Sequence, residues 1–150
     1  MASEGRIPIL GICLGMQLLA DESEEHGHHK GLGLIPGRVV RLKESQTNSK
    51  VPNVGWCETH QSRPSSLFTP DAGAQNYYCV HSFHFIPDDE QHSAATMLLG
   101  DKEIVSAVEH ANVAGVQFHP EKSQTDGLSL IARWAMTKGL LEPKPLATPT

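Results

Sequence analysis

One cysteine, set between two glycines where an apolar segment meets a helical pattern, constrains this chain more than any other feature. Residues 7–13 (IPILGIC) are apolar and β-branched and predict a buried strand. The pattern of residues 15–25 predicts a helix that begins just after Cys13. The turn between them has the form G-x-C-x-G, from Gly11 to Gly15, and such a turn is tight, strains the central residue and favours small neighbours two positions away. The sequence therefore predicts an α/β fold with Cys13 at a strand-to-helix bend.

The rest of the chain predicts more strand than helix. Four apolar or alternating segments are further strand candidates: 37–42, 51–59, 77–86 and 113–118. The pair Gly100-Asp101 predicts a hairpin between 94–99 and 104–109, and residues 126–138 predict a helix that ends at Gly139. We expect one partial domain over residues 1–141, followed by a loose C-terminal tail, 142–150, which holds three prolines.

The composition argues against nucleic-acid-binding, membrane-spanning, disulfide-rich and zinc-binding proteins. The formal net charge of -5 gives no reason to expect a nucleic acid or an anionic membrane as partner, and no apolar run is long enough to span a bilayer. The three cysteines, Cys13, Cys57 and Cys79, are an odd number with no C-x-x-C pair, which argues against a disulfide framework and a zinc site. We expect a cytoplasmic protein with reduced thiols, no metal and no cofactor.

Cys13 has two interpretations. A free cysteine is usually a small core residue. At a strand-to-helix bend, however, a helix N-terminus would lower the thiol pKa and offer backbone N–H groups to an oxyanion. A thiol nucleophile needs a base and the base needs an orienting acceptor. His119 follows the strand 113–118 and Glu121 can reach back to its imidazole, although this triplet taken alone favours an ordinary strand-to-turn transition.

Two motifs together resemble the class I, triad-type, glutamine amidotransferases: GICLGMQ at 11–17 and GVQFHPEK at 115–122. This resemblance implies a flavodoxin-like open sheet with helices and hydrolysis of glutamine to glutamate and ammonia. It makes Cys13 the nucleophile, His119 the general base and Glu121 its orienter. Gly15 and Gln17 would contact the substrate glutamine.

The stretches between the motifs narrow the resemblance to the amidotransferase subunits of imidazole glycerol phosphate synthases. They are SEEHG at 23–27, KGLGLIPG at 30–37, VPNVGW at 51–56, VHS at 80–82 and HPEKS at 119–123. In that family Glu25, His81 and Ser82 help to bind glutamine. Trp56 and Lys122 face the partner, a (β/α)8-barrel synthase subunit, which receives the ammonia through a channel and makes imidazole glycerol phosphate for histidine biosynthesis. The implied assembly is a heterodimer.

Departures from that family leave alternatives open. Its members have a substantial segment before the cysteine motif, so the strand 7–12 looks central to a sheet yet lies at the start of this chain. We therefore expect a truncated gene product, a misassigned start or one piece of a split domain, with an apolar sheet edge at this strand. Cys57 stands where the histidine-pathway enzymes usually have Asn, which keeps open a paralogue that supplies ammonia for surface-polysaccharide sugars. An inactive remnant and a cysteine peptidase are further alternatives, and Gln17 argues against the peptidase.

Overall fold

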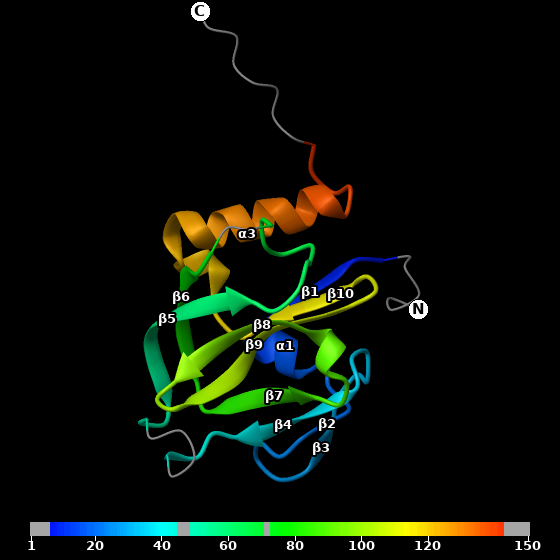
Figure 1. The fold of residues 1–150 in the computed structure, drawn as a ribbon. Coiled ribbons are helices and arrows are strands. Elements are labelled where there is room, and N and C mark those ends of the chain that lie inside the picture. Colours follow the sequence, from blue (N-terminus) through cyan, green and yellow to red (C-terminus); the bar gives the residue numbers. More distant parts are fainter. Residues whose placement is uncertain (1–6, 45–48, 71–72, 143–150) are drawn as a thin grey trace, which may run out of the picture.

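The computed structural model describes residues 7–44, 49–70 and 73–142 and arranges them in two sheets (Figure 1). The strands of the six-stranded sheet are, in spatial order, β1 (Ile9–Ile12), β10 (Val113–Val116), β9 (Lys102–His110), β8 (Ser93–Leu99), β5 (Asn53–Gln61) and β6 (Gln75–His81). Those of the four-stranded sheet are β3 (His29–Lys30), β2 (Glu22–Ser23), β4 (Gly37–Arg41) and β7 (Phe83–Pro87). The helices are α1 (Leu14–Gln17) and α3 (Gln124–Thr137), with single 3-10 turns at η2 (Glu90–His92) and η3 (Pro120–Lys122).

The predicted mixture of α and β, with more strand than helix, is confirmed. Within the described residues only the pairs β1–β10 and β2–β4 are parallel, and the other pairs are antiparallel. The hairpin predicted at Gly100-Asp101 joins β8 to β9. The end predicted for the last helix is also correct, because Gly139 has a φ of 73° and the N–H of Leu140 reaches back to the carbonyl of Ala135.

Two apolar cores hold these layers together. α3 lies across the six-stranded sheet in Figure 1, and its Leu130 is buried in a core with Tyr77 and Phe118, whose rings stack 4.0 Å apart. The second core lies between the sheets, where Met16 and Leu19 of the α1 segment pack with residues of β4, β7 and β10. The short α1 is therefore packed against both sheets, and this packing also holds Cys13, the residue that precedes it.

The helix predicted over residues 15–25 is wrong beyond its first turn. α1 ends at Gln17, and the chain then forms β2 instead of continuing as helix. The reason is tertiary, because the carbonyls of Leu18, Leu19 and Ala20 accept hydrogen bonds from N–H groups of residues 32–35 rather than from the next helical turn. The segment after β3 thus occupies the carbonyl acceptors that a longer helix over residues 15–25 would need.

The two outermost strands of the six-stranded sheet approach the same place. Cys13 follows β1 directly, and its N–H donates to the carbonyl of Val116 of β10. At the other end of the strand order, the carbonyl of Val80 in β6 lies 3.8 Å from the Cys13 sulfur. The curled sheet therefore brings β6 beside the end of β1, across four intervening strands.

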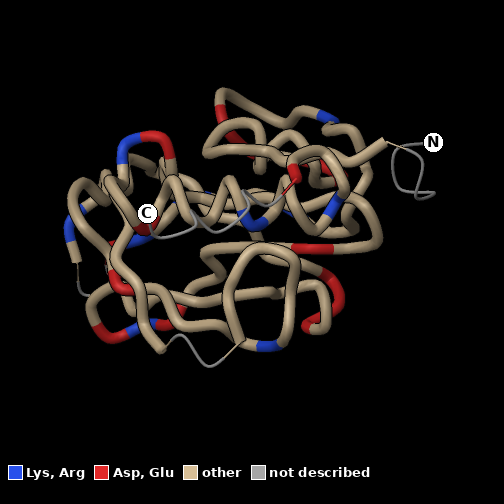
Figure 2. The backbone as a smooth tube through the Cα atoms, turned by 90° about the horizontal axis from the view of Figure 1, so that it is seen from above, with Lys and Arg blue, Asp and Glu red and all other residues tan. Residues whose placement is uncertain are grey.

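Several expectations concern the margins of the described part. β1 is the end strand of its sheet there and pairs along one edge with β10. The expected tail, 142–150, lies outside the described residues except for Glu142. No helix among the described residues has the length and apolarity needed to cross a membrane. Figure 2 shows acidic and basic residues interspersed along the backbone in that view.

Candidate active site

The bend at Cys13 is strained and tightly packed. Cys13 has φ 54° and ψ -107°, a region that residues with a β-carbon rarely adopt. A β-carbon on Gly11 would lie 2.6 Å from the backbone oxygen of Gly15, so the predicted need for a small residue is confirmed there. It is wrong for packing at Gly15, where a β-carbon would meet nothing within 4 Å. A side chain at Gly15 would therefore point into open space.

The Cys13 sulfur is half-buried between two polar groups. Its thiol donates to the carbonyl of Val80 at 3.8 Å, and the side-chain amide nitrogen of Gln117 lies 3.8 Å from the same sulfur. Gln117 lies two residues before His119 on the segment that leaves β10. The motif residues from both ends of the chain thus meet, although more than a hundred residues separate them.

The expectation of a lowered thiol pKa is wrong. Burial raises the pKa of the Cys13 thiol above its ordinary value, and the carboxylates of Glu121 and Glu25 act in the same direction. The backbone N–H of Leu14 and the amide of Gln117 lower that pKa, each by less than burial raises it, and the effect of Leu14 exceeds that of either carboxylate. Because α1 is a single turn, it offers less positive potential than a long helix would. The resting sulfur is therefore a neutral thiol that needs a base to ionise it.

His119 and Glu121 form the predicted pair. Nδ1 of His119 lies 2.6 Å from a carboxylate oxygen of Glu121, and the imidazole is mostly buried with 21% of its side chain exposed. A carboxylate can only accept a hydrogen bond, so Nδ1 carries the proton in this pair. In the neutral ring Nε2 then has the free lone pair, which is the state that a general base requires.

β6 holds both reactive residues. The N–H of His119 donates to the carbonyl of Tyr78 at 2.8 Å, two residues before the Val80 carbonyl that meets Cys13. Alternate carbonyls of a strand point to the same edge and lie about 7 Å apart. The sulfur and the His119 backbone are therefore anchored at neighbouring sites on one edge of β6.

Ser123 joins the backbone of His119 to β6 through two further hydrogen bonds. No role for this residue was predicted from the sequence. Its hydroxyl donates to the carbonyl of His119 at 2.6 Å and accepts from the N–H of Tyr78 at 2.9 Å. Ser123 is 1% exposed, so both bonds are shielded from water. A serine that ends the HPEKS stretch, just before a helix, was the available signal, but helix capping would have been the default interpretation.

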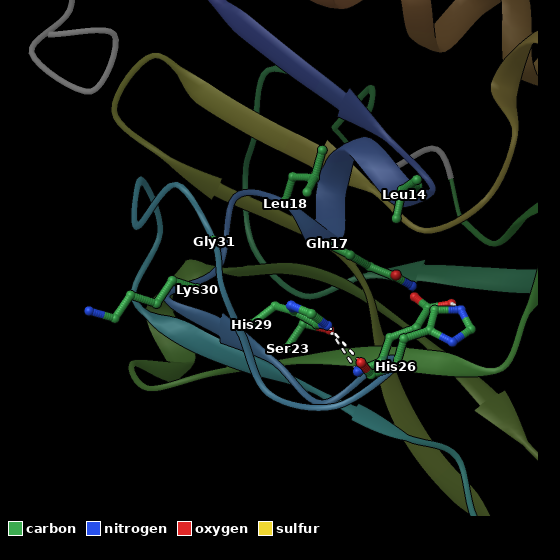
Figure 3. Close-up of a pocket in the computed structure, with 9 residues that line it drawn as sticks. Leu14, Gln17, Leu18, Ser23, His26, His29, Lys30 and Gly31 are labelled. Atoms are coloured by element: carbon green, nitrogen blue, oxygen red, sulfur yellow. Dashed lines mark hydrogen bonds and ion pairs between the residues drawn. The ribbon is translucent and has the colours of Figure 1, made fainter.

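A hollow of about 360 Å³ lies beside the bend. Figure 3 shows Leu14, Gln17 and Leu18 on one side of it and residues of the β2–β3 region on the other. Gln17 and Glu25, both predicted glutamine contacts, line this hollow. Gln17 is itself held in place, since its amide nitrogen lies 3.3 Å from the carbonyl of Phe83 and 3.2 Å from Oε1 of Gln117.

His81 and Ser82 do not line this hollow. His81 is 6% exposed, with Nδ1 at 2.8 Å from the carbonyl of Phe83 and Nε2 at 3.0 Å from the amide nitrogen of Asn53. Burial lowers the pKa of His81, in keeping with a neutral ring between those partners. The backbone of Ser82 accepts from the N–H of Leu42. A glutamine-binding role for these two residues stays a prediction.

Trp56 and Lys122, the predicted partner contacts, lie on the exposed side of the site. Trp56 is 52% exposed and packs edge-on against Tyr78, with ring centroids 6.0 Å apart. Val54 and Val80, which face each other in the β5–β6 pair, are 58% and 39% exposed. Lys122 is exposed at the end of η3, directly before Ser123, which shares a hollow of about 340 Å³ with Trp56. Val54, Trp56 and Val80 form an exposed apolar face on β5 and β6, and β6 is also the strand that anchors Cys13 and His119.

Three histidines, His26, His28 and His29, lie close together between β2 and the start of β3, and each has a local contact. His28 lies 2.9 Å from a carboxylate oxygen of Glu22, and Nε2 of His29 lies 2.7 Å from the carbonyl of His26. In the described part of the chain no three His, Cys, Asp or Glu side chains are grouped so that they could hold a metal ion.

Comparisons of the sequence with known proteins find a family and close relatives. The family described as "Glutamine amidotransferase class-I" matches residues 1–137. Among curated proteins, the imidazole glycerol phosphate synthase subunit HisH of Syntrophotalea carbinolica is 46% identical over 128 residues, which is 83% of this chain and 62% of that protein. HisH of Pyrococcus furiosus is 44% identical over 129 residues, or 86% of this chain and 64% of that protein. The chain thus spans about three fifths of the length of these relatives.

Solved structures share the fold. A putative GMP synthase protein from Thermoplasma acidophilum superposes with a TM-score of 0.63 at 20% identity, over 88% of this chain and 57% of that one. A glutamine amidotransferase from Thermotoga maritima gives a TM-score of 0.56 at 22% identity, over 89% of this chain and 47% of that one. At these identities the likeness concerns the fold.

Proposed function

Because this chain belongs to the class I glutamine amidotransferase family, we propose that it carries out the hydrolysis of glutamine to glutamate and ammonia. The observation that carries the proposal is the joint attachment of Cys13 and His119 to one edge of β6, beside a hollow lined by Gln17 and Glu25. A nucleophile, a base and its carboxylate partner, and a substrate-sized space are the parts that such a reaction needs.

The first half of the reaction forms a thioester. Nε2 of His119 takes the proton of the Cys13 thiol, and the sulfur attacks the side-chain amide carbon of glutamine. In this proposal the backbone N–H of Leu14 stabilises the oxyanion. His119 then gives its proton to the departing nitrogen, which leaves as ammonia, while Glu121 stabilises the imidazolium.

The second half restores the enzyme. Water enters, loses a proton to Nε2 of His119 and attacks the thioester carbon, so that glutamate leaves and the sulfur regains a proton. The raised thiol pKa fits this sequence, because the proton stays on sulfur until a substrate and the base are both in place.

Glutamine recognition uses the hollow beside the bend. Glu25 supplies a carboxylate that suits an α-amino group, and Gln17 supplies an amide held by two buried contacts. The open space over Gly15 leaves room for the side-chain amide of the substrate near the sulfur. His81 and Ser82 contribute in this proposal from the β6 end, next to Phe83.

The ammonia serves a synthase partner. We propose a (β/α)8-barrel subunit that docks on the face of Val54, Trp56 and Val80, with Lys122 at its margin, and that makes imidazole glycerol phosphate in the cytoplasm. The HisH names of relatives at 42–46% identity favour histidine biosynthesis over the surface-polysaccharide alternative.

The test measures glutamate release and ammonia-dependent synthesis in the same complex. The chain and a barrel partner should release glutamate from glutamine, and Cys13→Ala should abolish that release while synthesis with added ammonia continues. Cys57→Ala is the matched control and should hydrolyse glutamine normally. Glutamate release that persists in Cys13→Ala would refute the nucleophile. A wild-type chain that releases none, with or without the partner, would support the inactive remnant instead.

A further inference from the structure

We propose that Gln117 is a positioning residue, which fixes the Cys13 sulfur relative to Gln17 and donates an N–H to the thiolate formed during the reaction. The inference rests on the proposed function, because it concerns the same site. It assigns a role to a residue that touches the reactive sulfur and is otherwise part of the core.

The orientation of the Gln117 side chain follows from its neighbours. The amide nitrogen of Gln17 lies 3.3 Å from the backbone carbonyl of Phe83, which can only accept, so this end of Gln17 must be its NH2 group. The same NH2 group lies 3.2 Å from the second amide and must meet its oxygen. The NH2 group of Gln117 is therefore the end that faces the Cys13 sulfur, at 3.8 Å.

The position of Gln117 is rigid. Its side chain is 0% exposed, and its backbone N–H donates to the carbonyl of Ser106 at 2.8 Å. Gln17 is 7% exposed. A buried amide whose two ends have partners has one favourable orientation, because turning it over would face two donors toward each other. The chain Phe83, Gln17, Gln117, Cys13 thus links the hollow to the sulfur.

The donor becomes important when the sulfur ionises. The neutral thiol donates to the carbonyl of Val80, and that contact turns unfavourable once the proton leaves. Besides His119, the proposed base, the titratable groups that act on the sulfur are Glu121 of η3, Glu25 after β2 and Cys79 of β6, and both carboxylates oppose a negative sulfur. Gln117 is the side chain whose contact lowers the thiol pKa. Its N–H therefore offsets part of the cost of forming the nucleophile.

Two substitutions separate an electrostatic role from a merely structural one. Gln117→Glu keeps an acceptor for the Gln17 amide but replaces the donor at the sulfur with a negative charge. Gln117→Met has a similar length and removes both contacts. If Gln117 acts only by packing and by accepting from Gln17, the thiol pKa of Gln117→Glu should stay closer to the wild-type value than that of Gln117→Met. Our inference predicts a thiol pKa raised in both variants, and at least as far in Gln117→Glu.

The readout is the pH profile of Cys13 alkylation by iodoacetamide, followed by mass spectrometry. Trypsin releases residues 7–30 as a peptide that holds Cys13 without Cys57 or Cys79. At pH 8 we expect alkylation to slow about tenfold in Gln117→Met. This is the lower end of the range for the loss of a hydrogen bond to a charged group. Gln91→Glu, on the exposed η2 turn, is the control for added charge and should match wild type. Unchanged profiles in both Gln117 variants would overturn the inference.

A measurement on the unmodified side chain covers the case in which the variants do not fold. The side-chain NH2 signals of Gln117 in an NMR pH titration should shift with the pKa of the thiol, and the shift should vanish in Cys13→Ala. Gln117 signals whose chemical shifts do not change as the thiol ionises would overturn the inference. Neither experiment uses glutamine, so a failure of the proposed glutaminase activity would be recognised separately.

Discussion

Replacing Cys13 with glycine is expected to give a more stable protein than replacing it with alanine. Both changes remove the sulfur, so the comparison isolates the backbone. At φ 54° and ψ -107° a β-carbon is strained, and such strain costs about 1–3 kcal/mol. Glycine gives back about 0.4–1 kcal/mol through the greater freedom of the unfolded chain. The glycine variant should therefore be more stable by about 1 kcal/mol.

Urea or thermal unfolding of the two variants measures this difference. A gain of about 1 kcal/mol corresponds to a Tm increase of about 2–4 °C for a domain of this size. Ala132→Gly, within α3, is the control with ordinary helical backbone and should lose about 0.5–1 kcal/mol. If Cys13→Gly unfolds at the same temperature as Cys13→Ala, or below it, the bend is not strained and the reasoning about the nucleophile's backbone fails.

Three further changes test other parts of the structure. Gly11→Ala should destabilise the fold by about 1–3 kcal/mol or prevent folding, because its β-carbon would meet the Gly15 backbone. Gly15→Ala should unfold at nearly the wild-type urea concentration, and equal losses of stability in the two variants would contradict this. Ser123→Ala leaves the N–H of Tyr78 without its acceptor and removes one of the two hydrogen bonds to the carbonyl of His119, which keeps the bond from Lys122. It should cost about 1–3 kcal/mol and slow glutamine hydrolysis, and an unchanged kcat would refute its positioning role. Burial lowers the pKa of His84 to about 4, so the unfolded chain binds the extra proton first, and stability should decline as pH falls from 6.5 through 4. His84→Gln should remove about 1–3 kcal/mol of that decline, and an identical pH dependence in both proteins would refute it.

The parts of the site that were predictable have local signatures. Cys13 sits between two glycines after an apolar strand, and His119-Pro-Glu follows another, so short-range rules and the family resemblance identified both residues. The hairpin at Gly100-Asp101 and the helix end at Gly139 were predictable for the same reason, since turn geometry depends on a few adjacent residues. The contact between Cys13 and the region of His119 required only that both strands end at the same side of one sheet.

The failures concern features set by distant residues. The helix after Cys13 stops at Gln17 because residues 32–35 take the carbonyls that it would use. The thiol pKa is raised because burial and two carboxylates outweigh a single helical turn, and neither burial nor Glu25 can be placed from periodicity. The contact of His81 with Asn53, its cross-strand neighbour in β5, is not a failed prediction but a feature that only the strand register reveals.

The most direct test of the account is labelling by a glutamine analogue with an electrophilic ketone. The account predicts one adduct, on Cys13 in the peptide 7–30, whose formation is slowed by free glutamine and by Glu25→Gln. Cys57 and Cys79 should remain unmodified under the same conditions. Labelling of Cys57 in preference to Cys13, or Cys13 labelling that glutamine does not slow, would contradict the claim that this sulfur serves a glutamine site.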